Sequence, residues 1–107
     1  MNKFGEFIKT EISRNNISQN KFAEKLGVSS YYLGQLMKGE KRPPSRELQL
    51  RIVEILDLNT IKQIEFFDLI AKEKRDIPSD IYNDVINNEE KWNDVRKLLS
   101  KGEVKLW

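Results

Sequence analysis

The sequence predicts an all-α fold, and three observations support this prediction. Apolar residues recur three and four positions apart along most of the 107-residue chain, which is the spacing of one helix face. The five glycines and three prolines are confined to a few places, so long stretches contain no helix breaker. No segment of useful length alternates apolar and polar residues as a strand would. A chain of this length is expected to form one domain, or one domain with a helical appendix.

Four helices are predicted within the first 58 residues, each with an apolar stripe and a boundary signal. They cover about residues 3–15, 19–26, 30–38 and 46–56. A serine that can accept a first-turn N–H precedes each of the last three helices, at Ser18, Ser29 and Ser45. Gly27 and Gly39 follow the second and third helices, at positions where a positive φ is cheap only for glycine.

Three further helices are predicted beyond residue 58. The first starts at residue 59 or 60, and together they cover about residues 60–74, 79–87 and 89–100. The inward stripe of the first is expected to contain Ile61, Ile64, Phe67 and Ile70, and Phe66 and Leu69 are expected to widen it. Asn88 is expected to cap the last helix.

The residue types present argue against several kinds of chemistry. The chain has no cysteine, so it offers no disulfide and no thiolate metal ligand. It has no histidine, which removes the Ser-His-Asp triad and most zinc sites. We therefore expect no enzyme, no metal and no cofactor. The first residues do not resemble a signal peptide, and no apolar run approaches the roughly 20 residues of a membrane span. A cytoplasmic protein without membrane contact is the expectation.

The charge is distributed unevenly along the chain. The formal net charge is only +2. Residues 1–58 carry ten Lys and Arg against seven Asp and Glu, whereas residues 59–107 carry nine against ten. A basic half beside a slightly acidic half fits one end that faces DNA and another that faces elsewhere.

The segment from residue 17 to residue 45 carries the most specific signal. It contains two short predicted helices joined by a turn of about four residues that includes Gly27. Ala23 is small where the two helices would cross closely, and Val28 can bury its side chain beneath both. A helix-turn-helix needs these features so that its second helix projects from the body of the protein.

One face of that second helix suits contact with DNA. Tyr31, Gln35 and Lys38 follow the i, i+4, i+7 spacing and lie opposite the apolar residues of the same helix, Leu33, Leu36 and Met37. Glutamine can pair bidentately with adenine in the major groove. Four cations cluster within and just after the helix and can hold phosphates: Lys38, Lys41, Arg42 and Arg46.

The same segment resembles the helix-turn-helix of the Cro and phage-repressor type, the lambda-repressor-like or XRE family. The residues in register are Ser18, Gln19, Phe22, Ala23, Leu26, Gly27, Val28, Ser29, Leu33, Leu36, Gly39, Pro44 and Ser45. The match covers about residues 3–58. The resemblance implies a five-helix DNA-binding domain, here followed by additional short C-terminal helices.

The resemblance also implies a role for individual residues. Ser30 and Tyr31 fall at the start of the recognition helix, where side chains reach base edges, and Gln35 falls at a third reading position. Gln19 falls where the family often contacts a phosphate from the start of the preceding helix. Tyr32 is assigned to phosphate binding together with the cations named above, and the alternative is that its ring packs on the first or the fourth helix.

These observations predict a sequence-specific transcription regulator that binds double-stranded DNA as a homodimeric repressor. Residues 1–58 would form the DNA-binding core, and residues 59–107 would contact a second copy or another protein. The alternative is a helix-turn-helix that binds protein, such as an antitoxin or an inhibitor from a phage or mobile element. Tyr31 and Tyr32 are bulkier than the residues common in the family, and Met37 stands where glutamate is frequent, which leaves room for this alternative.

Overall fold

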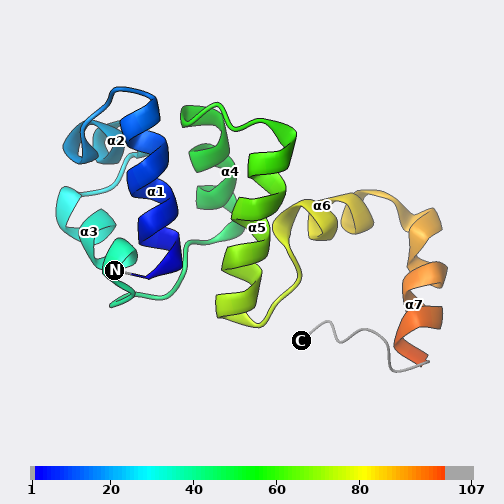
Figure 1. Ribbon diagram of the computed structural model, residues 1–107. Helices are drawn as coiled ribbons and strands as arrows, with labels where there is room; N and C mark the ends of the chain where they lie inside the picture. Colours follow the sequence, from blue (N-terminus) through cyan, green and yellow to red (C-terminus); the bar gives the residue numbers. More distant parts are fainter. Residues whose placement is uncertain (1, 101–107) are drawn as a thin grey trace.

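The computed structural model describes residues 2–100, with side chains up to residue 97, and helices are the only regular secondary structure in this part of the chain (Figure 1). It contains no strand, so the predicted all-α class is confirmed. The α-helices, together with one 3-10 turn, η1, are α1 (Lys3–Arg14), α2 (Gln19–Leu26), α3 (Ser30–Lys38), α4 (Arg46–Ile55), α5 (Thr60–Lys74), α6 (Ser79–Asn87), η1 (Glu89–Lys91) and α7 (Trp92–Ser100).

The predicted boundary residues lie at the starts and ends of the first helices, as expected. A serine hydroxyl accepts a first-turn backbone N–H at the start of α2, α3 and α4, from Ser18, Ser29 and Ser45. The left-handed residues after α2 and α3 are Gly27 with φ 82° and Gly39 with φ 78°. The first six helices begin and end within one residue of their predicted positions, and local capping sets both ends of α2 and α3.

The hydrophobic core lies among α1 to α5. Its fully buried side chains include Phe4, Ile8, Phe22, Leu26, Leu33, Leu36, Ile52, Phe66 and Ile70. The ring of Phe66 stacks on Phe7 with the centroids 5.4 Å apart and lies 6.2 Å from Phe4. α5 therefore completes the same core that α1 begins, and this core extends across the division placed after residue 58.

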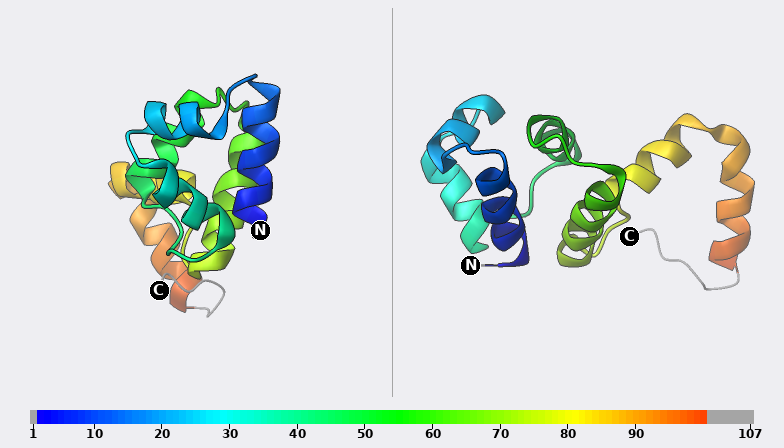
Figure 2. Two further views of the ribbon diagram at one scale, coloured as in Figure 1. Left: turned by 90° about the vertical axis from the view of Figure 1, so that its left-hand side faces the viewer. Right: turned by 45° about the horizontal axis from the view of Figure 1, so that its top comes forward.

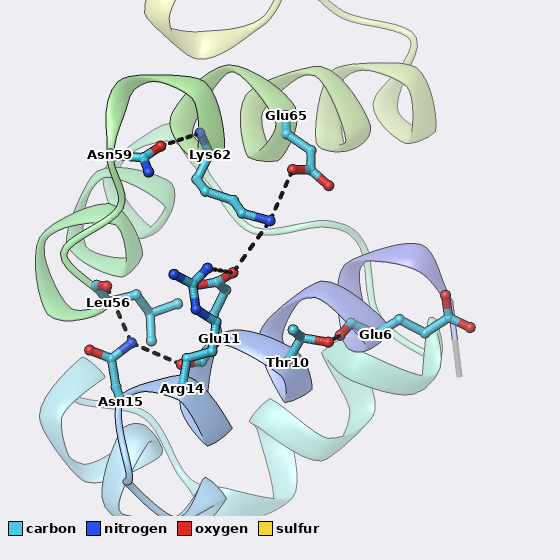
Figure 3. Close-up of polar contacts among 9 residues, drawn as sticks. All are labelled: Glu6, Thr10, Glu11, Arg14, Asn15, Leu56, Asn59, Lys62 and Glu65. Carbon is cyan, nitrogen blue, oxygen red and sulfur yellow. Dashed lines mark hydrogen bonds and ion pairs between the residues drawn. The ribbon is translucent and has the colours of Figure 1, made fainter.

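A partly buried polar cluster joins α1 to α5 (Figure 3). The carboxylate of Glu11 is almost fully buried and accepts from Arg14 at 3.3 Å, while Lys62 Nζ lies 3.8 Å away. Asn15 donates to the carbonyl of Leu56 at 3.3 Å, which ties the end of α1 to the end of α4. The buried charge of Glu11 is thus compensated by two cations.

A second polar cluster fastens α6 to α4. The hydroxyl of Ser79 donates to Gln49 Oε1 at 2.7 Å, and Gln49 Nε2 donates to the carbonyl of Pro44 at 2.9 Å, all in buried positions. Beside them Arg46 Nη2 lies 2.8 Å from Asp76 Oδ2, and its guanidinium is 3.7 Å from the centre of the Tyr82 ring. The start of α6 is therefore fixed to the start of α4.

The C-terminal helices extend away from the core. The described residues span 46 × 25 × 21 Å, with α2 and α3 at one end and α7 at the other (Figures 1 and 2). η1 and α6 are linked by the Lys91 ammonium, whose hydrogen bond to the Asp84 carboxylate raises the pKa of Lys91 above its ordinary value. The indole of Trp92 donates to the carbonyl of Val85 at 2.6 Å. None of the helices in the described range is long and apolar enough to cross a membrane.

Two expectations for residues beyond 58 are wrong. Ile61 and Ile64 do not face the core: they are exposed, and Phe66, Phe67, Ile70 and Ala71 form the buried stripe of α5. Asn88 does not cap the last helix: a 3-10 turn precedes α7, and Asn88 makes no side-chain capping hydrogen bond there, while its amide donates backward to Asp84. Residues 101–107 lie outside the described part of the chain.

Candidate nucleic-acid interface

The turn between α2 and α3 occupies residues 27–29. Gly27 takes the left-handed conformation, and the N–H of Val28 reaches back to the carbonyl of Ala23 at 3.1 Å. Val28 is half-buried and packs on the core, while Ala23 is buried where α2 meets its neighbours. Ser29 then begins α3 by accepting the N–H of Tyr32 at 3.0 Å. These are the local features that the sequence predicts for a helix-turn-helix.

α3 has one buried face and one exposed face. The buried side chains are Leu33, Leu36 and Met37, which pack against the core beneath. On the opposite side Tyr31 is 75% exposed, Lys38 is exposed and Gln35 is half-buried. α3 packs mainly on α1 and α2. Figures 1 and 2 place α5, α6 and α7 on the other side of the molecule, so they do not cover this face.

A hydrogen bond links two of the predicted base-reading residues. Gln35 Nε2 donates to the hydroxyl oxygen of Tyr31 at 2.9 Å, across one turn of the helix. Ser30, the third predicted reading residue, is exposed at the first position of α3. The structure therefore brings all three residues to the exposed part of one short helix.

Gln19 reaches α3 from the start of α2. Gln19 is exposed, and a β-carbon built on Gly34 would lie 3.9 Å from Gln19 Nε2. The amide of Gln19 thus lies beside the middle of α3, at the distance of an ordinary contact from this position. This amide and the Tyr31–Gln35 pair are neighbours on the same end of the molecule, although they come from different helices.

The loop after α3 contributes exposed cations. Gly39 ends the helix, and Lys38, Lys41 and Arg42 are all exposed around it. The N-terminal segment is attached to the end of α3, since the backbone N–H of Asn2 donates to the carbonyl of Met37 at 3.2 Å. Three side chains of one sign beside the exposed face of α3 can attract a polyanion.

Two predicted phosphate-binding residues have other surroundings. The guanidinium of Arg46 is held by Asp76 and Tyr82, and its Nε atom is buried with no hydrogen-bond partner among the described residues. Tyr32 is half-buried and packs against the core. Because the guanidinium of Arg46 is paired with a carboxylate and the ring of Tyr32 packs on the core, we leave Arg46 and Tyr32 out of the candidate interface.

Sequence reasoning found the exposed residues but missed two of their contacts. The i, i+4 spacing of Tyr31 and Gln35 could have indicated their hydrogen bond. The approach of Gln19 to Gly34 had no local signal, because it depends on how α2 crosses α3. The candidate interface is accordingly Gln19, Ser30, Tyr31, Gln35, Lys38, Lys41 and Arg42.

An open groove of about 1080 Å³ lies elsewhere, between α1 and α5. Its walls carry side chains of both charges, including Glu6, Lys62 and Asp68, above the apolar Phe7 and Leu69. Within residues 2–100, His, Cys, Asp and Glu form no group of three or more that could hold a metal ion.

Comparison of the chain with protein-family models, with curated proteins and with solved structures found no match. The resemblance to repressor-type helix-turn-helix proteins therefore rests on the residues named above.

Proposed function

We propose that this protein is a transcription regulator that binds double-stranded DNA sequence-specifically, as a cytoplasmic homodimeric repressor. The observation that carries the proposal is the exposed face of α3. Tyr31, Gln35 and Lys38 lie on it, Lys41 and Arg42 flank it, and the C-terminal helices leave it uncovered. The major groove of B-DNA is about 12 Å wide and admits an α-helix presented in this way.

The two kinds of side chain on this face serve different purposes. Gln35 can read a base edge, since glutamine matches the donor and acceptor of adenine. Lys41 and Arg42 can bind phosphates and so supply affinity that falls with salt, without selecting a sequence. Gln19, at the start of α2, can hold a further phosphate. Such a division between positioning and reading supports a sequence-specific binder.

A homodimer follows from the size of the reading surface. One short helix contacts only a few base pairs, too few to specify a site. Two copies related by a two-fold axis would present two α3 helices to half-sites about 34 Å apart, one turn of DNA. α6 and α7 lie at the far end from α3 and are the natural place for contacts between the copies.

Selection from random duplex DNA tests the proposal directly. We expect the full chain to enrich a palindrome whose half-sites are centred about one helical turn apart. The matched control is the variant Gln35→Ala/Lys41→Ala/Arg42→Ala, which removes one half-buried and two exposed side chains outside the core and should fold normally yet enrich nothing. Failure of the unmodified chain to bind any duplex at low ionic strength would contradict the proposal.

Exposed apolar side chains favour a protein-binding module as the second candidate. Ile61 is 77% exposed and Ile64 is 48% exposed, on the same side of α5. If the chain binds no DNA, this surface of α5 becomes the favoured site of a protein contact, because exposed apolar side chains that lie together often mark such a contact.

A further inference from the structure

The hydrogen bond between Gln35 and Tyr31 lies where it contributes little to folding. The two residues are one turn apart on the outer side of α3, and Tyr31 is 75% exposed. Water can replace either partner at such a position, so the net gain to the folded state is small. The bond does restrict Gln35, whose long side chain would otherwise sample many rotamers.

The direction of this bond determines what Gln35 can offer to a ligand. The amide nitrogen Nε2 has two hydrogens, and one of them is donated to the Tyr31 hydroxyl at 2.9 Å. One N–H and the acceptor Oε1 remain. The major-groove edge of adenine presents one acceptor, N7, and one donor, the N6 amino group, and so complements this pair.

Guanine is disfavoured by the same arrangement. Its major-groove edge presents two acceptors, N7 and O6, and a free glutamine amide could meet both with the two hydrogens of Nε2. Once one hydrogen is engaged by Tyr31, a single donor is left, and Oε1 would face a guanine oxygen. Two acceptors in contact without a hydrogen between them repel each other.

We propose that Tyr31 is a positioning residue whose hydroxyl sets the base preference of Gln35, for adenine and against guanine. This inference rests on the proposed DNA-binding function and names the base that the interface selects. It changes the role of Tyr31 from direct base contact to control of its neighbour. Preorganisation of this kind increases selectivity because the side chain is already oriented before DNA arrives.

The test compares three variants with the unmodified chain: Tyr31→Phe, Gln35→Ala and the double variant. Each is assayed by competition between duplexes that carry adenine or guanine at the position in the selected half-site where Gln35→Ala removes the preference. The unmodified chain should prefer adenine. Tyr31→Phe keeps the ring and removes only the hydroxyl, so the adenine preference should fall about tenfold. The double variant should show no further loss beyond Gln35→Ala, because the hydroxyl acts through the amide.

Two further readouts distinguish positioning from a structural role. The melting temperature of Tyr31→Phe should equal that of the unmodified chain, since the hydroxyl is exposed. The dependence of its affinity on salt should also be unchanged, because no phosphate contact is lost.

Three possible results of these assays would overturn the inference. A Tyr31→Phe variant that binds DNA with undiminished adenine preference would overturn the inference and leave the proposed function intact. A preference of the unmodified chain for guanine would also overturn it, because the amide would then be turned with both hydrogens toward the base. Absence of sequence-specific binding by the unmodified chain would refute the proposed function and this inference with it.

Discussion

At the scale of single residues, two glycines at α3 have opposite structural roles. Gly39 is left-handed, and a β-carbon there would lie 3.2 Å from Asn2 Nδ2. Gly34 lies inside the helix, and a β-carbon there would make only an ordinary contact, 3.9 Å from Gln19 Nε2. Gly39 is thus required by its backbone conformation, whereas Gly34 weakens the helix that carries the candidate interface.

Substituting these glycines should change stability in opposite directions. Gly34→Ala should raise the free energy of unfolding by about 1 kcal/mol, because alanine has the higher helix propensity and meets no clash. Gly39→Ala should lower it by about 1 kcal/mol or more, because alanine is strained at positive φ. Urea denaturation of both variants checks the prediction, and shifts of the same sign would contradict it.

The predicted contribution of Arg42 to DNA binding is that of a single positive charge. Arg42→Ala should weaken binding to every duplex by a similar factor and reduce the slope of log affinity against log salt by about one. The matched control is Lys72→Ala, which removes an exposed cation from α5, a helix outside the candidate interface. An unchanged slope for Arg42→Ala would show that this side chain binds no phosphate.

At the scale of elements, α5 belongs to the same packed domain as the first four helices, because its buried face completes their core. Phe66 is completely buried against Phe4 and Phe7 of α1, whereas Ile61 of the same helix is exposed. Phe66→Ala should lower the free energy of unfolding by about 3–5 kcal/mol, the cost of a cavity in a core. Ile61→Ala should change it by less than about 0.5 kcal/mol. Similar losses in the two variants, measured by chemical denaturation, would mean that α5 packs on its other face.

One buried hydrogen bond of the cluster that attaches α6 to α4 can be removed by a single substitution. Ser79→Ala would leave Gln49 Oε1 buried without its donor, and this should destabilise the protein by about 1–3 kcal/mol. Ser13→Ala, at an exposed position of α1, serves as the control and should have almost no effect. A Ser79→Ala variant as stable as the control would show that water replaces the lost hydroxyl.

The boundaries of these elements were largely predictable, but the orientation of α5 was not. Capping residues such as Ser18 and Gly27 act within their own helix turn, so the sequence alone reveals them. α5 carries apolar residues on several sides, including Ile64, Phe66 and Phe67, so the spacing is compatible with more than one buried face. The packing of Phe66 against the rings of Phe4 and Phe7 in α1 accompanies the observed face, and this contact cannot be read from the spacing within α5.

At the scale of the whole molecule, the candidate interface and the C-terminal helices lie at opposite ends (Figure 2). The exposed face of α3 was predictable, because the buried positions of a short amphipathic helix determine its outer positions. The surroundings of Arg46 were not predictable, because its partner Asp76 is 30 residues away in the chain. The sequence therefore predicts where the proposed interface lies on α3, but it does not predict which residues of the following loop and helix belong to it.

The proposed separation of ends can be tested by mapping amide chemical shifts of the labelled full chain during titration with its selected duplex. Binding by α3 predicts that the largest changes occur at the start of α2, along α3 and in the loop through Arg42, with α5 nearly unaffected. Changes confined to α5–α7, or spectra that stay constant with every duplex at low ionic strength, would contradict a DNA-reading role for α3.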